Sequence, residues 1–442
     1  MLSPRSLVAL ALSFALILIG INSQSGWLFW LAGLSIAALF VSWVDSLAEV
    51  RKLDVARVLP SEAVEGEAVK ITLRVRNRGR FSRNLLLLVD EDPSDKGTPG
   101  HFRLKHARPR LRDFFAARPP HRPEQTALAG GRALLLLPRV EAGETVSLSY
   151  PREGLRRGIY SDWPVRIYSE GVLGLARHHA KLGVVSRLTV LPRHVELSFL
   201  PLLDSLPRKA WSLAGRSAKG GGMDFYGVRE FQPGDPLHHV HWKTTARRGE
   251  LVVREFEEES CMPLLVLIDN RKVAGSSGRE GTLLDIQARL AASVVRYALL
   301  YGHPVTLAAY QGREPIHYDV QGFHAALHWL ASLDPSGEPA PEEQVQGLRP
   351  LLAGNSLLCQ LVVADGADWE RVASALPSSC RFALILVAPH SDEESGASPG
   401  GNGEREAFLR DLLLEPPPGM VGFALYREGD DLAQCLEKSF LV

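Results

Sequence analysis

Two apolar runs at the start of the chain constrain its fold more than any other feature. The runs cover residues 7–21 and 27–44, carry no charged residue, and are separated by a polar turn. At a rise of about 1.5 Å per residue, the second run can cross a hydrocarbon core of about 30 Å, and the first can do so with its flanks. We therefore expect a transmembrane hairpin over residues 1–45. A signal peptide is the alternative for the first run, but no small-x-small cleavage site follows Gly20.

Basic residues flank this predicted hairpin on one side only. Arg5 precedes the first run, whereas Arg51, Lys52 and Arg57 follow the second, and the connecting turn is uncharged. Because positive charge is retained on the cytoplasmic side, both ends of the hairpin and all that follows are predicted to be cytoplasmic.

The remaining length and charge predict two soluble domains without a nucleic-acid partner. A chain of 442 residues is too long for one core of ordinary size. Lys plus Arg and Asp plus Glu both number 50, so no global field would hold the chain on nucleic acid. No two cysteines have C-x-x-C or other metal spacing, so we expect reduced, buried thiols. The cysteines are Cys261, Cys359, Cys380 and Cys435.

Residues 46–200 are predicted to form a β-rich, sandwich-like domain. Apolar and polar residues alternate over 69–75 and again over 144–150, which is the period of half-buried strands, and 85–89 is a continuous apolar run. The insertion 93–132 carries 9 Lys/Arg and 3 Asp/Glu, a net charge of +6. A solvated loop is the favoured interpretation, contact with anionic lipid headgroups is the alternative, and nucleic acid is disfavoured for want of an aromatic stacking platform.

Residues 263–442 are predicted to form an α/β domain with a doubly wound, mainly parallel sheet. Buried strands alternate with amphipathic helices, a pattern that places helices on both faces of such a sheet. The predicted strands are 264–268, 305–309, 357–364, 382–388 and 422–425. The predicted helices are 283–301, 323–333, 369–376 and 404–414.

The linker between these domains, 201–262, holds the most distinctive motif in the chain. The motif consists of Gly220-Gly221-Gly222, Phe225, Gly227, Arg229-Glu230-Phe231, Pro233-Gly234-Asp235, His241-Trp242-Lys243, Ala246-Arg247 and Glu255-Phe256-Glu257. It resembles the signature of the bacterial family called domain of unknown function 58. Arg157-Gly158-Tyr160, Gly174-Leu175, Val190-Leu191-Pro192 and the two predicted spans also resemble that family, which implies a von Willebrand factor A-like fold for the last domain and a place in the bacterial inner (plasma) membrane.

The chemistry of this linker leaves two interpretations open. Pro233-Gly234 favours a turn that presents Asp235, and Val240 and Trp242 are expected to be buried anchors on one face of a strand. The charged residues form either a structural ion-pair network or a docking surface for a protein, with catalysis the weakest alternative. The candidate partner-binding residues are Arg229, Glu230, Asp235, His241, Trp242, Lys243 and Arg247. A metal site at His238, His239 and His241 is disfavoured because no third ligand shares a face with His239 and His241.

A further expectation comes from the von Willebrand factor A resemblance, which implies a Mg²⁺ site built on Asp-x-Ser-x-Ser after the first strand. Here Asp269 is retained, but Arg271 and Val273 replace the two serines. Asp365 is placed to match a second ligand, and Ser276 or Ser277 could substitute for the lost serines. Because Arg271 puts a cation where the metal should bind, we expect a degenerate site with no metal and no cofactor.

No phosphate-binding loop, nucleophile elbow or cysteine protease pattern is present, which favours a protein without enzymatic activity. We expect a membrane-anchored scaffold or adaptor. The family resemblance implies a MoxR-type AAA ATPase as partner, and also a transglutaminase-like membrane protein. The alternative is an uncharacterised hydrolase or metal-dependent ligand-binding protein that uses Asp269, Asp235 and the histidines.

Overall fold

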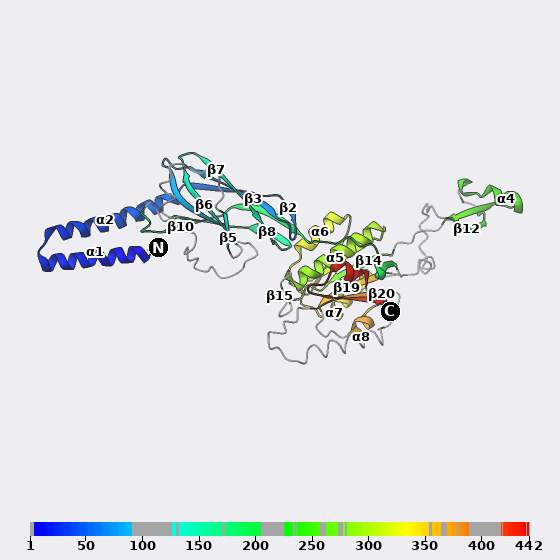
Figure 1. Cartoon of the computed structure of the whole chain (residues 1–442). Helices are drawn as coiled ribbons and strands as arrows, with labels where there is room; N and C mark the ends of the chain where they lie inside the picture. Colours follow the sequence, from blue (N-terminus) through cyan, green and yellow to red (C-terminus); the bar gives the residue numbers. More distant parts are fainter. Residues whose placement is uncertain are drawn as a thin grey trace. The chain divides into compact units, whose positions relative to one another are not determined.

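The computed structural model divides the chain into two units, Met1–Leu191 and Pro192–Val442, and each has its own hydrophobic core (Figure 1). It describes residues 4–90, 126–129, 132–169, 173–204, 225–232, 235, 237–256, 262–272, 277–278, 281–352, 356–363, 369–377, 380–388, 417, 419–438 and 440–441.

Two apolar helices begin the first unit, as the sequence predicts. α1 (Pro4–Ser23) and α2 (Gly26–Glu49) are both long and apolar enough to cross a membrane. They lie antiparallel, and the hydroxyls of Ser13 and Ser35 join them at 2.8 Å (Figure 1). α2 is longer than the predicted run because its last turns are buried against the β-rich part of the same unit, where Ser46 is 0% exposed.

The β-rich part of the first unit consists of three sheets. Their strand orders are β1-β3-β7, β10-β9-β4-β6-β5 and β2-β11-β8. The strands are β1 (Leu53–Val58), β2 (Glu62–Val64), β3 (Val69–Asn77), β4 (Arg83–Asp90), β5 (Thr126–Ala129), β6 (Arg132–Val140), β7 (Thr145–Arg152), β8 (Gly158–Asp162), β9 (Val165–Ser169), β10 (His178–Leu182) and β11 (Val185–Leu191). All described pairings are antiparallel except that of β2 with β11.

The predicted alternation in β3 holds residue by residue. Ile71, Leu73 and Val75 are fully buried, and they share one core with apolar residues of β4, β6, β7, β9 and β11. Inward-facing residues from several sheets around one core are typical of a sandwich. Most of the basic insertion 93–132 lies outside the described residues, but its predicted end was wrong, because Thr126–Ala129 already forms strand β5.

A seven-stranded sheet forms the body of the second unit, in the order β18-β17-β14-β19-β20-β21-β22. The strands are β14 (Leu264–Ile268), β17 (Val305–Gln311), β18 (Glu314–Asp319), β19 (Leu357–Val363), β20 (Arg381–Ala388), β21 (Met420–Arg427) and β22 (Phe440–Leu441). The inner five are parallel, and the two edge strands are antiparallel to their neighbours. The predicted mainly parallel sheet is confirmed, although its polar edge strand β18 was not predicted.

Helices cover both faces of this sheet. α5 (Leu283–Leu300) and α6 (Phe323–Ser332) lie on one face, and α7 (Pro341–Gly347) and α8 (Trp369–Ala375) lie on the other (Figure 1). A capping box of Thr282 and Asp285 fixes the start of α5. The unit also contains α3 (Pro201–Asp204), η4 (Arg349–Leu352), α10 (Leu432–Glu437) and the short pair β15 (Ser277–Gly278) with β16 (Gly281–Thr282). The predicted helix 404–414 lies outside the described residues.

A small hairpin carries the motif of the linker, and we call residues 225–256 the signature hairpin. Its antiparallel strands are β12 (Phe225–Glu230) and β13 (Val252–Phe256). Between them lie the 3-10 helix η3 (Leu237–His239) and helix α4 (Trp242–Arg248).

Candidate functional site

An internal ion pair fixes the first turn of the signature hairpin. Arg229 leaves β12 and makes a bidentate pair with Asp235, with both nitrogen–oxygen distances at 2.7 Å. The Asp235 carboxylate also accepts the backbone N–H of Gln232 at 2.8 Å, and the Asp235 N–H closes the turn onto the Gln232 carbonyl. The side chain of Asp235 is 10% exposed. This pair therefore stabilises the hairpin itself, while Pro233-Gly234 lie outside the described residues.

His241 ends the irregular segment and begins α4. Its Nδ1 accepts the backbone N–H of Thr244 at 3.2 Å and lies 2.8 Å from the Thr244 hydroxyl. Gly249 ends the helix with φ of +75°, in the left-handed conformation that favours glycine. The predicted strand through Val240 and Trp242 was therefore wrong, because His241 caps a helix that starts at Trp242.

Trp242 points to solvent, which contradicts its predicted role as a buried anchor. Its exposed fraction is 64%, whereas Val240 is 2% exposed and is buried as predicted. The exposed Leu237 and Leu251 add apolar surface to the same hairpin. Lys243 follows Trp242 directly on α4.

The short helix also ends in exposed basic residues, Arg247 and Arg248. Glu230, at the end of β12, is exposed as well. The hairpin thus combines a large exposed aromatic side chain with exposed cationic groups.

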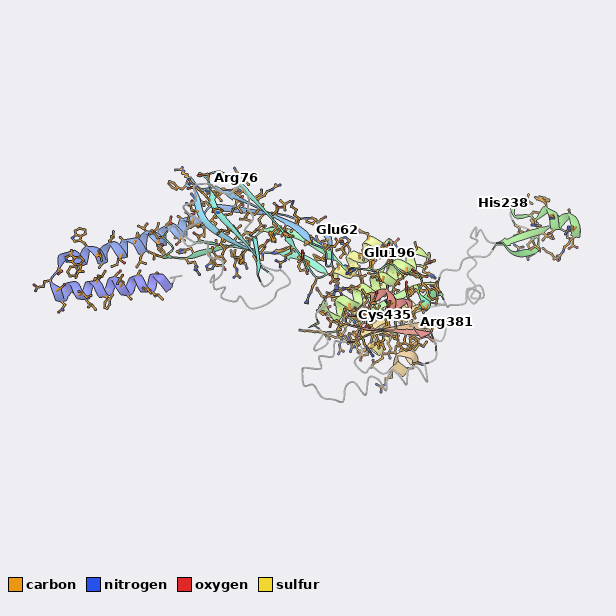
Figure 2. All side chains as sticks on the ribbon, in the orientation of Figure 1. Glu62, Arg76, Glu196, His238, Arg381 and Cys435 are labelled. Carbon is orange, nitrogen blue, oxygen red and sulfur yellow. The ribbon has the colours of Figure 1, made fainter. Side chains whose placement is uncertain are left out.

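The histidines of the hairpin do not share a strand face. His238 lies on η3 and is exposed (Figure 2). His241 uses its ring nitrogen to cap α4. The side chain of His239 lies outside the described residues. The sequence placed His239 and His241 on one face of a predicted strand. In the structure η3 and the N-cap of α4 take the place of that strand, so the predicted shared face does not exist.

The second candidate is Asp269, at the carboxyl end of the central strand β14. The strand lies between β17 and β19, so the chain order reverses beside it, and such switch points are where open α/β sheets bind ligands. Asp269 is 1% exposed. Its position therefore matches the place expected for a ligand site, and its partners decide what it can bind.

Basic and amide donors occupy both oxygens of the Asp269 carboxylate. Arg271 donates from Nε to one oxygen and from a terminal nitrogen to the other, each at 2.8 Å. Gln344 of α7 adds a third donor at 3.1 Å. Asn270, the next residue, is buried and bridges the backbone of Tyr310 and Asp334.

These residues do not fit a divalent cation. Mg²⁺ needs oxygen ligands, and here a guanidinium lies where the metal would lie and takes the carboxylate in a bidentate pair. Asp365 and Ser276 lie outside the described residues, as does the side chain of Ser277, so their predicted contributions stay predictions.

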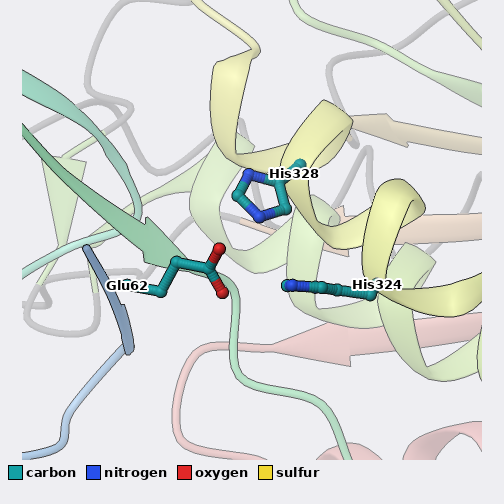
Figure 3. Close-up of side chains that lie close together, drawn as sticks. All are labelled: Glu62, His324 and His328. Atoms are coloured by element: carbon teal, nitrogen blue, oxygen red, sulfur yellow. The ribbon is translucent and has the colours of Figure 1, made fainter. Parts of the chain in front are cut away.

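Two further histidines lie one turn apart on α6. The ring centroids of His324 and His328 are 4.7 Å apart (Figure 3). Glu62, also drawn there, belongs to β2 of the other unit and is not counted with the pair. Within the described part of the second unit no third His, Cys, Asp or Glu joins them, and two imidazoles supply half the ligands of a tetrahedral zinc site.

The three described cysteines are unpaired thiols. Burial raises the pKa of Cys359 to about 12. Burial, with Asp430 beside it, likewise raises the pKa of Cys435 to about 12. Burial also raises the pKa of Cys380. A thiol with a raised pKa is a weak nucleophile and metal ligand at neutral pH.

A buried ionic cluster in the first unit was missed from the sequence. Arg57 pairs with Asp90, both side chains being 0% exposed, and donates to the Trp163 carbonyl at 2.7 Å. Its guanidinium lies 4.5 Å from the centre of the Trp163 ring, and Tyr150 donates its hydroxyl to Asp90. The sequence analysis used Arg57 only as a charge that flanks the second apolar run. The cluster is enclosed in the core, so we interpret it as structural.

Comparison with known proteins places the signature hairpin at the start of a family match. Residues 227–394 match the family model described as "Protein of unknown function DUF58". "Uncharacterized protein YeaD" of Bacillus subtilis (strain 168) is 28% identical over 125 residues, which make up 28% of this chain and 31% of that protein. The match thus spans less than a third of the length of that relative.

Likeness to solved structures is weak. BslA, a bacterial hydrophobin, has a TM-score of 0.19 at 13% identity, covering 33% of this chain and 98% of its own. A GH20 exo-β-N-acetylglucosaminidase from Vibrio harveyi has a TM-score of 0.21 at 10% identity, covering 76% of this chain and 82% of its own. Scores at this level transfer neither fold nor activity.

Proposed function

Because the chain belongs, through residues 227–394, to the family described as protein of unknown function DUF58, we propose that it is a membrane-anchored scaffold whose signature hairpin docks a protein partner. α1 and α2 are the proposed anchor. The partner that the family resemblance implies is a MoxR-type AAA ATPase, with a transglutaminase-like membrane protein as a second component.

The observation that carries the proposal is the exposure of Trp242 beside basic residues. Tryptophan and arginine dominate the energetics of protein interfaces when a partner buries them. Lys243 and Arg247 lie on the same short helix, so the complementary surface would be acidic with an apolar pocket for the indole. Leu237 and Leu251 extend the exposed apolar surface of the hairpin beyond Trp242, and contiguous apolar surface of this kind marks interaction sites.

The orientation of the anchor rests on fewer charges than the sequence indicated. Arg57 is enclosed with Asp90 in the core, so it is no longer a free flanking charge. Arg5, Arg51 and Lys52 remain, and they still support cytoplasmic placement of both soluble units. The order of parallel strands around β14, with Asp269 at its end, supports the proposed von Willebrand factor A-like assignment.

The alternative hydrolase or metal-dependent function uses Asp235 and Asp269, and both carboxylates are already in bidentate pairs with arginines. A general base or metal ligand needs lone pairs that face the substrate or ion. Stoichiometric Mg²⁺, Mn²⁺ or Zn²⁺ in the purified chain, lost on Asp269→Ala, would favour this alternative.

Capture from native membranes tests the docking proposal. The tagged full chain is extracted in mild detergent, and the bound proteins are identified by mass spectrometry for wild type, Trp242→Ala and Arg247→Ala. The matched controls are Leu300→Ala, at a side chain 74% exposed on α5, and Arg313→Ala, at a side chain 83% exposed. We expect the hairpin variants to lose an AAA ATPase that wild type and both controls retain. Equal capture by all five chains would contradict the proposal.

Substitution of Arg229 is a poorer test of partner docking than the sequence indicated. Because it pairs with Asp235 and that carboxylate holds the turn, Arg229→Ala would alter the hairpin as well as its surface. Trp242 and Arg247 are the better probes, since exposed side chains without buried partners change stability little when truncated.

A further inference from the structure

The loop between β3 and β4, residues 78–82, is attached to the end of α2. The N–H of Arg78 donates to the carbonyl of Lys52 at 2.9 Å. The N–H of Asn84 donates to the carboxylate of Glu49, the last residue of α2, at 2.7 Å. These two bonds fix the position of the loop along the axis of α2.

Asn77 holds this loop in a defined conformation. Its side chain is fully buried, accepts the N–H of Gly79 at 2.8 Å, and donates to the carbonyls of Phe81 at 2.8 Å and Val140 at 3.2 Å. A Cβ at Gly79 would lie 2.7 Å from the guanidinium of Arg83 and 2.9 Å from Oδ1 of Asn77, so a side chain there would displace these groups. This rigid loop presents Phe81, which is 76% exposed.

The length of α2 sets the depth of the loop. A hydrocarbon core of about 30 Å takes roughly 20 helical residues, so a span that starts at Gly26 ends near Asp45. Glu49 then lies roughly 6 Å beyond the core, within the headgroup layer. The contact of Ser46 with His178 at 2.8 Å, one residue beyond Asp45, places the start of β10 at the edge of the core.

The charges around Phe81 suit an anionic surface. Arg80, Arg51 and Lys52 are exposed at this end of the unit. Arg78 is paired with Asp54, so those two charges cancel. Arg76, labelled in Figure 2, marks the same end of β3.

The acidic residues of the adjoining turn are engaged locally. Glu141 pairs with Arg139 at 2.8 Å, and Glu144 accepts the N–H of Glu141 at 2.6 Å. Glu144 keeps its negative charge, but Arg80, Arg51 and Lys52 outnumber it, so the net charge beside Phe81 is basic.

We propose that this loop is a second membrane contact, in which Phe81 enters the headgroup region while Arg80, Arg51 and Lys52 bind anionic lipid phosphates. Phenylalanine is among the residues that interfacial segments bury at the boundary of headgroups and acyl chains, and basic residues next to a span bind acidic lipids. The inference rests on the proposed membrane anchoring by α1 and α2, and the contact fixes how the β-rich domain stands on the bilayer.

Site-directed labelling of the full chain tests the contact. The Phe81→Cys chain is reconstituted into phosphatidylcholine vesicles with or without phosphatidylglycerol, and labelled with an environment-sensitive fluorophore. The background from native cysteines is measured on the unsubstituted chain. The matched control is Val185→Cys, because Val185 is 99% exposed. Val185 is the first residue of β11, which follows β10 in the chain. β10 begins at His178, which contacts Ser46 of α2, and it extends away from α2 by about 3.4 Å per residue as far as Leu182.

We expect the label at position 81 to be blue-shifted and quenched by lipids spin-labelled near the headgroup, more strongly in anionic than in neutral vesicles. Arg80→Ser should reduce the anionic excess, and the label at position 185 should stay aqueous. Aqueous emission at both positions would overturn the contact, and equal quenching in neutral and anionic vesicles would overturn the anionic specificity. Carbonate extraction of the same vesicles distinguishes failure of the Phe81 contact from failure of the anchor. A chain that carbonate releases is not anchored by α1 and α2, and it refutes the proposed anchor as well as the contact.

Discussion

Replacing Arg271 by alanine removes the cation that neutralises a buried carboxylate. The side chain of Asp269 is 0% exposed and that of Arg271 is 18% exposed, so the pair is largely shielded from water. Breaking such a pair by removing one partner costs about 3 to 5 kcal/mol, because the remaining charge stays buried. Gln344 still donates one hydrogen bond to Asp269, which favours the lower end of that range.

The expected loss is large enough to measure in the full chain. For a domain of this size, 1 kcal/mol shifts Tm by about 2 to 4 °C, so Arg271→Ala should lower the Tm of the second unit by about 6 to 20 °C. Hydrogen exchange of the β14 and β19 amides, followed by mass spectrometry in detergent, reports the change locally. The control Arg313→Ala breaks an exposed pair with Glu338 and should cost less than about 1 kcal/mol.

A second substitution isolates the charge from the packing. Asp269→Asn combined with Arg271→Ala removes both charges, so it should be less destabilised than Arg271→Ala alone. If Arg271→Ala behaved like the Arg313 control, or if the double variant were the less stable, the guanidinium would not be the counter-ion of this site.

The other predictions concern metal, thiols and pH. Magnesium should not raise the Tm of the wild-type chain, and a rise that vanishes in Asp269→Asn would contradict the loss of the site. Cys359 and Cys435, whose pKa values burial raises to about 12, should resist a maleimide at pH 7 in the folded chain and react in urea; labelling of the native chain would refute this. Burial and the neighbouring Arg296 lower the pKa of His194 from 6.5, so the unfolded chain takes up that proton first. The contribution of neutral His194 to the stability of the fold is therefore present above about pH 6.5, and it is lost as the pH falls from there through the lower pKa of the folded chain. A Tm difference between wild type and His194→Gln that does not change with pH would show that this pKa is not lowered.

The sequence predicted best those elements whose residues are buried on every side. β14 was predicted over its full range, and β19 and β20 to within one residue, because buried parallel strands are continuous apolar runs. The start of α5 was marked by Leu283, just after the cap Thr282. Strand β18 was missed because it lies at the sheet edge and shows no fully buried residue.

The signature hairpin was harder to predict because local side-chain contacts decide its backbone. Alternation around Val240 and Trp242 fits a strand, but the Nδ1 of His241 caps a helix instead. The position of Trp242 within the motif could not show whether it faces a core or a partner. Arg57 was likewise assigned to the membrane flank because its partner, Asp90, lies in another sheet.

Crosslinking at position 242 tests the central proposal most directly. A photoreactive amino acid replaces Trp242 in the full chain within its native membrane, and a matched chain carries it in place of Leu300, which is also exposed. The docking proposal predicts that irradiation joins position 242, and not position 300, to an AAA ATPase. A position 242 that crosslinks only within its own chain, or no more to the ATPase than position 300, would contradict it.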